Sequence, residues 1–243
     1  MAKILVCPIA FNENIKIQSV IERFLKSSAF GHVDYLVVND GSTDATTAII
    51  SEYADQGVRS IKHNARQGVG AAIRTAIDYA SKEGYDVLVI MAGNDKDDPD
   101  EIFSLVEPIV NDDYDFVQGS RYLGGCGATG DMPLYRKLAT RLHPLLFSLF
   151  AGHWVTDSTN GFRAMRLAIF KDTRICIHQS WLDHYELEPY LLFKALTLGY
   201  KFKEVFVTKK YPPKKLGYTK MKPIVGWWSI LKPIFYLGLR IKR

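Results

Sequence analysis

A short apolar run that ends in an acidic, glycine-containing turn is the feature that most constrains the fold. Leu36–Val38 leads directly into Asn39-Asp40-Gly41-Ser42, and Thr43-Asp44 follow. This pattern predicts a buried strand whose end presents a carboxylate and free backbone groups at one edge of a sheet. In open α/β folds, ligands bind at that edge. Asp40 is therefore a candidate to accept a hydrogen bond from a base N–H or a ribose hydroxyl; the alternative is a structural Asx turn.

Apolar runs and helical patterns alternate along the first half of the chain. We expect strands over residues 3–8, 33–38, 58–62, 86–91 and 116–119, and helices over residues 15–28, 45–56, 68–84 and 99–110. This alternation predicts a single Rossmann-like α/β domain, with a mostly parallel central sheet flanked by helices on both faces. The second half predicts a helix over 134–152 that is kinked or broken at Pro144, a strand over 161–169, a helix over 188–199 and a strand over 203–207.

Composition excludes several protein classes. The 243 residues are 47% apolar and 23% charged, which is ordinary for a globular domain. The three cysteines are odd in number and lack paired spacing, which argues against a disulfide framework or a zinc site. The apolar run at the N-terminus is too short for a signal peptide, so we expect a cytoplasmic protein.

The charge is concentrated at the C-terminal end. Residues 201–243 contain twelve Lys and Arg and one acid, a net charge of +11, so the total of +5 leaves −6 for the first 200 residues. Residues 222–243 are aromatic and basic, and Lys232-Pro233 interrupt their apolar run. We therefore expect a domain over 1–221, with 222–243 attached peripherally to the cytoplasmic face of an anionic membrane rather than spanning it. The alternative is a C-terminal helix packed on the domain and covering the active site.

Two further loops follow predicted strands in the first half. Pro8 is expected to end the first strand, Phe11 is placed to stack on a planar base, and Glu13 begins the next helix. The loop Asn64–Ala72 contains Gly68, which allows close backbone approach at a helix N-terminus where phosphate is favoured. This loop matches neither a Walker A loop nor G-x-G-x-x-G, so the dinucleotide interpretation is weak.

The loop after the fourth strand is acidic. Ala92-Gly93-Asn94 lead into four aspartates, whose oxygens suit a hard divalent cation. Asp98 and Asp100 are better explained as favourable charges at a helix start. Asn94 and Asp95 lie closest to the strand end and are the better ligand candidates.

The second half carries further charged candidates. Arg121 is suited to bidentate phosphate binding, and Asp157 is a candidate general base. Arg163 is a candidate anion ligand, Glu188 a second acid, and Lys214 and Lys220 flank a glycine, although each of these residues could be structural.

Six motifs in order give the chain its resemblance to a known family: Pro8–Glu13, Asn39–Thr46, Asn64–Ala72, Gly119–Tyr122, Asp157–Arg163 and Lys214–Lys220. The chain resembles the inverting GT-A glycosyltransferases of family 2, and among them the polyprenyl-phosphate sugar transferases of the dolichyl-phosphate mannose synthase type. The resemblance implies transfer from a nucleotide-diphospho-sugar to a lipid phosphate or a glycan. It implies catalytic roles for Asp157, Glu188 and Arg121 and acceptor binding by Arg163. The donor site that it implies comprises Pro8, Phe11, Glu13, Val38, Asp40, Arg66, Gly68, Ala92, Gly93, Asn94, Lys214 and Lys220.

The chain departs from the family at its D-x-D motif, which falls on Ala92-Gly93-Asn94. Three outcomes are open. Asn94 with Asp95 or Asp97 could hold Mg²⁺ or Mn²⁺; the reaction could proceed without metal, using Arg121, Lys214 and Lys220; or the chain could bind nucleotide-sugars without transfer. A lipid phosphate needs no base, whereas a sugar hydroxyl would need Asp157 or, second, Glu188. No nucleic-acid recognition module is visible, so we expect no nucleic-acid partner.

Overall fold

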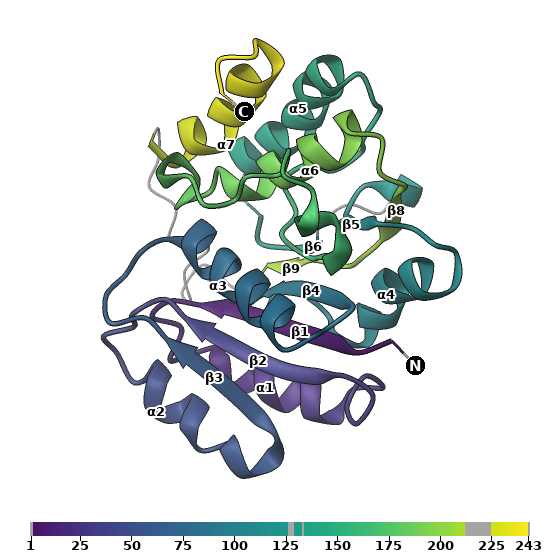
Figure 1. Ribbon diagram of the computed structural model, residues 1–243. Coiled ribbons are helices and arrows are strands. Elements are labelled where there is room, and N and C mark those ends of the chain that lie inside the picture. Colours follow the sequence, from purple (N-terminus) through teal and green to yellow (C-terminus); the bar gives the residue numbers. More distant parts are fainter. Residues whose placement is uncertain (1, 126–128, 133, 212–224, 243) are drawn as a thin grey trace.

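The computed structural model describes residues 2–125, 129–132, 134–211 and 225–242 (Figure 1). Its centre is a seven-stranded sheet with the order β3-β2-β1-β4-β7-β5-β8. Every pairing is parallel except those of β7, which runs antiparallel to both β4 and β5. The strands are β1 (Ile4–Ala10), β2 (Asp34–Asn39), β3 (Val58–Lys62), β4 (Val87–Ala92), β5 (Phe116–Ser120), β7 (Arg163–Arg166) and β8 (Phe202–Phe206), and β6 (Thr129–Gly130) pairs with β9 (Lys210–Tyr211).

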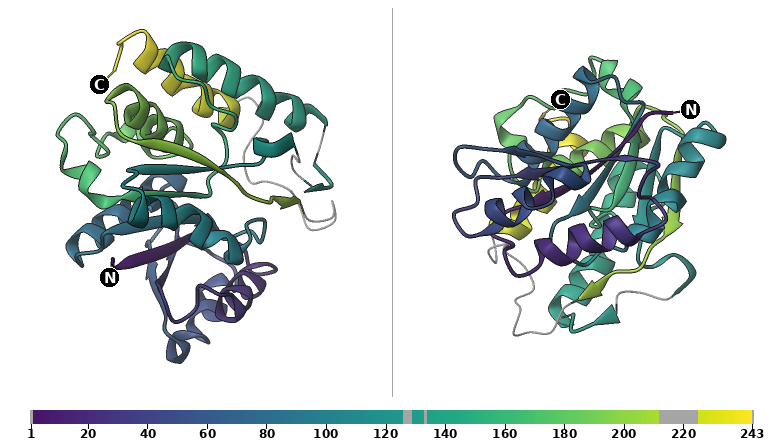
Figure 2. Two further views of the ribbon diagram at one scale, coloured as in Figure 1. Left: turned by 90° about the vertical axis from the view of Figure 1, so that its right-hand side faces the viewer. Right: turned by 90° about the horizontal axis from the view of Figure 1, so that it is seen from below.

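Helices cover both faces of the sheet, as the alternation of strands and helices predicts (Figure 2). One face is covered by α1 (Ile17–Lys26), α2 (Thr46–Ser51) and α4 (Ile102–Asn111). The other is covered by α3 (Val69–Lys82), α5 (Leu134–Ala151), α6 (Leu187–Thr197) and α7 (Val225–Gly238). Alternate strand residues divide between these layers; in β1, Leu5 and Cys7 face one core and Val6 and Ala10 the other. The predicted fold class is confirmed.

Proline has less effect on the elements than the sequence suggests. The first strand does not end at Pro8, because β1 continues to Ala10 and Pro8 itself is in register with Met91 of β4. A proline removes one N–H from the ladder, and the pairs on either side of it persist. Pro144 lies inside α5, which continues through it to Ala151, so the alternative of a broken helix is wrong.

The short strand β7 brings the motif Asp157–Arg163 to the middle of the sheet. Ala164 is in register with both Val89 of β4 and Val117 of β5. The loop that precedes β7 therefore lies beside the end of β5, where Gly119–Tyr122 begins. Two motifs about 40 residues apart in the sequence become neighbours.

The C-terminal segment includes a helix that packs on the domain. Helix α7 contacts α5 and α6, and its Ile234 and Leu237 are buried in the core. The main-chain oxygen of Ile230 lies 3.4 Å from Nε2 of His143 on α5, and Lys232 forms an ion pair with Glu186. The helix thus packs on the domain, as the second alternative expects, while Trp227 and Trp228 on it remain exposed; membrane attachment of this segment stays a prediction. In the described ranges, no helix is both long and apolar enough to cross a bilayer.

Candidate active site

A pocket of about 820 Å³ opens at the carboxyl ends of β1, β2 and β4 and extends beneath α5, α6 and α7. Parallel strands place their following loops at this edge, so segments far apart in sequence meet there. Most of its charged lining residues come from the loops after the strands, and the wall formed by α5 and α7 is largely apolar apart from Arg136, Thr140 and His143. The pocket is therefore two-sided, with a different chemistry at each side.

Phe11, Asp40 and Arg66 line the polar side. The Arg66 guanidinium carbon lies 4.4 Å from the centre of the Phe11 ring, a cation–π arrangement with a flat face next to the pocket. Asp40 is buried, and its carboxylate accepts hydrogen bonds from the backbone N–H groups of Gln67 and Gly68, each at 2.8 Å. Asp40 therefore fixes the loop that carries Arg66, while still lining the pocket.

The glycines of this loop accommodate the protein's own backbone. A Cβ atom on Gly68 would clash with the carbonyl oxygen of Asp183, and one on Gly70 would clash with that of Leu182. The N–H of Ala71, at the start of α3, donates to the Asp183 oxygen at 3.0 Å. The close approach at Gly68 is therefore made by the loop around Asp183, and Gly68 also lines the pocket, where the expected phosphate stays a prediction.

At the end of β4 the side chains diverge. Ala92 and Asn94 line the pocket, and the Asn94 Oδ1 atom is buried with no hydrogen-bond partner. The Asp95 carboxylate lies against α1, where it accepts from Ser19 at 2.8 Å and Arg23 at 2.9 Å. Asp95 is thus committed to a structural ion pair, contrary to its expected place beside Asn94 as a metal ligand.

A lysine takes the pocket position instead. The Lys96 side chain is buried and lines the pocket, and its ammonium lies 5.0 Å from the centre of the Tyr211 ring. Burial lowers the pKa of Lys96 to about 7, and the charges of Arg136, Lys209 and Lys16 act in the same direction. The end of β4 therefore presents a lysine whose pKa lies near neutral pH, where the sequence predicted carboxylates.

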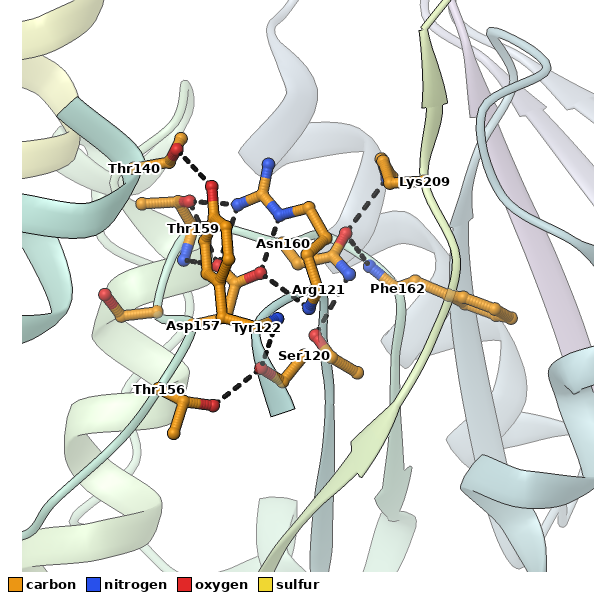
Figure 3. A network of polar contacts seen from close by, with 12 residues as sticks. Ser120, Arg121, Tyr122, Thr140, Thr156, Asp157, Thr159, Asn160, Phe162 and Lys209 are labelled. Atoms are coloured by element: carbon orange, nitrogen blue, oxygen red, sulfur yellow. Dashed lines mark hydrogen bonds and ion pairs between the residues drawn. The ribbon is translucent and has the colours of Figure 1, made fainter. Parts of the chain in front are cut away.

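Arg121 and Asp157 form a buried ion pair (Figure 3). Arg121 Nε lies 2.6 Å from Asp157 Oδ2, and Nη2 lies 2.7 Å from Oδ1. Burial alone would raise the pKa of Asp157, but the charge and hydrogen bonds of Arg121 outweigh it and hold the pKa below its ordinary value. Thr159 also donates to this carboxylate, through its N–H at 3.1 Å. Asp157 is thus positioned to orient Arg121, which lines the pocket, and Asp157 does not line it.

Arg163 and Glu188 form a second pair below the pocket. The Arg163 side chain is 2% exposed and donates from Nη1 to the Glu188 main-chain oxygen at 2.8 Å and from Nη2 to that of Asn160. Its Nη2 also lies 3.6 Å from the Glu188 carboxylate, which lines the pocket from the first turn of α6. Arg163 therefore supports Glu188 from beneath, and its burial does not fit direct contact with an acceptor.

The structure brings most of the expected site residues together, and their roles there stay predictions. Those that line the pocket are Phe11, Glu13, Asp40, Arg66, Gly68, Ala92, Asn94, Arg121 and Glu188. The pocket lining does not include Pro8, Val38, Gly93, Asp95, Asp157 or Arg163. Lys214 and Lys220 lie outside the described residues.

Sequence reasoning missed Lys96, because it treated the loop 92–101 as acidic and considered its carboxylates alone. It also missed Arg136 and the role of α5 as a wall. The sequence does carry a signal for the role of α5. Five leucines recur at spacings of three and four, which places them on one helical face: Leu134, Leu138, Leu142, Leu145 and Leu149. In the structure each is more than half exposed, and we call this row the α5 stripe.

The apolar wall of the pocket joins the α5 stripe. Tyr135, Leu142 and Trp227 line the pocket, and about half of each side chain is exposed to solvent. Leu146 and Leu231 continue the wall inward. An apolar route therefore leads from the outer surface of α5 and α7 to the charged side of the pocket.

Comparison with known proteins agrees with this geometry. The model of Glycosyl transferase family 2 matches residues 6–174. The UDP-N-acetylglucosamine–dolichyl-phosphate N-acetylglucosaminyltransferase of Methanococcus voltae is 30% identical over 176 residues, covering 67% of this chain and 68% of that protein. The polyprenol monophosphomannose synthase of Mycolicibacterium smegmatis is 27% identical over 214 residues, covering 87% of this chain and 78% of that protein.

A solved structure shares the fold. Glucosyl-3-phosphoglycerate synthase from Mycobacterium tuberculosis, in complex with Mn²⁺, UDP and glucosyl-3-phosphoglycerate, superimposes with a TM-score of 0.65 at 20% identity. The superposition covers 100% of this chain and 81% of that one. With the family model matching well over half of its length, this chain belongs to glycosyl transferase family 2, and it is a glycosyltransferase of the GT-A fold.

Proposed function

We propose that this protein transfers a sugar from a nucleotide-diphospho-sugar to the phosphate of a polyprenyl lipid at a membrane surface. The single observation that carries this proposal is the two-sided pocket, in which a cationic end meets an apolar wall continuous with the exposed α5 stripe. A lipid phosphate has that same division, an anionic head on a long apolar chain. The relatives from Methanococcus voltae and Mycolicibacterium smegmatis bear names that specify dolichyl-phosphate and polyprenol-phosphate chemistry.

The donor would lie along the strand ends. Its base would stack near Phe11 and Arg66, its diphosphate would pass the end of β4, and its sugar would lie toward Glu188. In an inverting transfer, an acceptor phosphate oxygen attacks the anomeric carbon on the face opposite the diphosphate. The bond from that carbon to the diphosphate breaks, and the nucleoside diphosphate departs with the electron pair. No proton has to be removed from an ionised phosphate, so this reaction needs no general base.

We also propose that the protein lies on the membrane surface through the α5 stripe together with Trp227 and Trp228 of α7. Exposed leucines on one helical face, with tryptophans and the neighbouring exposed cations Lys137 and Arg141, suit an interfacial site on anionic lipid. This places the membrane contact on α5 as well as on the C-terminal segment. This arrangement is consistent with the location expected from the sequence, on the cytoplasmic face of a membrane.

A transfer assay tests the proposed reaction. Purified protein would be incubated with UDP-, GDP- and CDP-sugars labelled in the sugar, and with polyprenyl phosphate in detergent micelles. We expect label in the organic phase with one donor, and release of the matching nucleoside diphosphate. Transfer to soluble glycans but not to the lipid would refute the acceptor. Binding of donors with no transfer to either acceptor would favour a nucleotide-sugar-binding protein.

A further inference from the structure

We propose that Lys96 provides the positive charge for the donor's diphosphate at the end of β4, so that this protein binds its donor without a divalent cation. The inference rests on the proposed function in requiring a nucleoside-diphosphate donor. It separates this chain from the structurally similar synthase, whose complex contains Mn²⁺ together with UDP.

The residues at the end of β4 do not fit a divalent cation. The first position of the family's carboxylate pair is Ala92, and the second is Asn94, whose single free amide oxygen is neutral. A hard cation needs several oxygen ligands, usually including carboxylates. Among the described residues, no three His, Cys, Asp or Glu side chains converge in a way that could hold a metal. The undescribed positions contain no Asp, Glu or His in their sequence.

The nearby carboxylates are already used by the fold. Asp95 accepts from Ser19 and Arg23, as described above. Asp97 accepts the Ala92 N–H at 2.9 Å through one oxygen and the Lys209 ammonium through the other. A cation at this position would have to compete with these contacts to gain a charged ligand.

The carboxylates of the pocket itself are also engaged. Glu13 lies 3.5 Å from the Lys16 ammonium, and the Glu188 carboxylate lies 3.6 Å from Arg163. Asp40 accepts two backbone N–H groups and lies 2.9 Å from Nδ1 of His63. The acids of the pocket therefore stabilise loops and arginines rather than converging on one point.

Cations converge near the end of β4. Three of them surround Tyr211: Lys96 lies 5.0 Å and Arg136 5.6 Å from the ring centre, and Arg121 Nη1 donates to the hydroxyl at 3.1 Å. All three line the pocket. Like charges repel one another in a buried cluster, so such a cluster is stabilised when a multiply charged anion binds among them. A diphosphate supplies that anion; Arg121 already pairs with Asp157, while Lys96 and Arg136 lie against the tyrosine ring.

Lys96 is the cation best placed to replace the metal. It follows the end of β4 by four residues and lines the same pocket as Ala92 and Asn94, together with Phe11, Arg66 and Glu188. A donor diphosphate bound at the end of β4 would lie near this side chain. A lysine ammonium can contact oxygens of both phosphates, as it does in other phosphate sites where it acts as a point charge.

Calorimetric titration with UDP, GDP and CDP tests the proposal without an activity assay. Each would be titrated into metal-stripped protein, once with EDTA and once with Mn²⁺. The nucleoside diphosphate that binds is expected to have dissociation constants within about twofold of each other in the two buffers, since a bound anion favours the charged form of Lys96. The variant Lys96→Met should weaken its binding by at least about tenfold, the effect of losing a charged hydrogen bond. Binding of the corresponding nucleoside should be unchanged, which excludes a merely structural defect.

Two further variants complete the test. Lys96→Arg, which keeps the charge, should retain more affinity for the diphosphate than Lys96→Met. Lys82→Met, an exposed lysine at the far end of α3, should behave as the unaltered protein. Diphosphate binding that requires Mn²⁺, or that survives Lys96→Met at full strength, would overturn the inference while leaving the proposed function intact. Failure of all three diphosphates to bind in either buffer would overturn both.

Discussion

Arg121 and Asp157 hold each other through two hydrogen bonds of 2.6 and 2.7 Å, and neither side chain is more than 2% exposed. An ion pair of this kind stabilises a fold only while both members remain charged, because the partner left behind would be an unpaired buried charge. Asp157 also joins the loop before β7 to the end of β5, through the Arg121 N–H at 3.1 Å. The ion pair therefore connects the loop before β7 to the end of β5, and it also fixes the position of Arg121 in the pocket.

We expect Asp157→Asn to lower the free energy of unfolding by about 3–5 kcal/mol, because it leaves the Arg121 guanidinium buried without its counter-charge. Urea denaturation would measure the change. Asp112→Asn is the control, since Asp112 is exposed and lies 3.6 Å from Lys203, and its effect should stay within about 0.5 kcal/mol. A stable Asp157→Asn protein that has lost only its activity would instead support the general-base role expected from sequence.

Glu188→Gln distinguishes the two acceptor classes. With polyprenyl phosphate as acceptor, we expect kcat to fall by less than about tenfold, since no proton is removed, whereas loss of a required base costs roughly 10²–10⁴-fold. Steady-state assays with donor and lipid acceptor both saturating would measure kcat. A loss of a hundredfold or more with the lipid acceptor would contradict the absence of base catalysis.

Gly70→Ala tests the close contact between α3 and the loop around Asp183. The added Cβ would clash with the Leu182 oxygen and lie 2.6 Å from the His184 oxygen, so we expect a loss of about 2 kcal/mol or more in unfolding free energy. Gly57→Ala is the comparison. Gly57 has φ +86° with nothing within 4 Å of the added atom, so only backbone strain of about 1 kcal/mol should result. Equal losses of unfolding free energy in the two variants would show that the loop around Asp183 moves away from the added atom at little cost.

His143 makes stability depend on pH. Burial lowers its pKa to about 4, from an unfolded value near 6.5, so the folded state keeps a neutral imidazole. At pH 7 both states are unprotonated and there is no effect. Between about pH 6.5 and 4, His143 is protonated in the unfolded chain but not in the folded protein. The free energy of unfolding therefore falls by up to about 3 kcal/mol as the pH is lowered through this range.

The difference between unaltered protein and His143→Gln isolates this effect from the carboxylates. Urea unfolding at a series of pH values should show the unaltered protein losing more stability than the variant as the pH falls through this window. Parallel pH profiles for the two proteins would mean that the imidazole gains its proton in the folded state as readily as in the unfolded chain.

The α5 stripe should direct membrane binding. Leu138→Glu with Leu149→Glu places two charges on exposed positions outside the pocket lining, and we expect co-sedimentation with phosphatidylglycerol liposomes to weaken by about tenfold or more. Phe30→Glu with Val110→Glu is the control, on exposed apolar residues in the turn after α1 and on α4, the helices that cover the opposite face of the sheet. These substitutions are a cleaner test than removing residues after Met221, which would delete the buried side chains of α7. Equal binding by both double variants would refute the docking surface.

The sequence predicts the sheet and its helices because each depends on a local period of apolar residues. Residues 58–62 form the expected strand with the expected bounds. The sequence does not predict which charged groups pair, because pairing depends on contacts between segments that are distant in the chain. Asp95 turns to Arg23, and Asp157 turns to Arg121, across 72 and 36 positions of the chain. The same limit explains the glycines at 68 and 70, whose neighbour is a loop more than 110 residues later.

The order of the pocket's parts along the chain has a consequence for biosynthesis. Trp227, Ile230 and Leu231 line the pocket and come after every other described residue that does so. During translation the sheet and its strand-end loops can form before this helix leaves the ribosome, since domains begin to fold as the chain emerges. The apolar wall is then added last, and until it arrives Phe150 of α5 lacks its ring contact with Phe235 of α7. A nascent chain stalled before residue 225 would therefore expose an apolar surface to which chaperones bind. It would also lack one wall of its pocket.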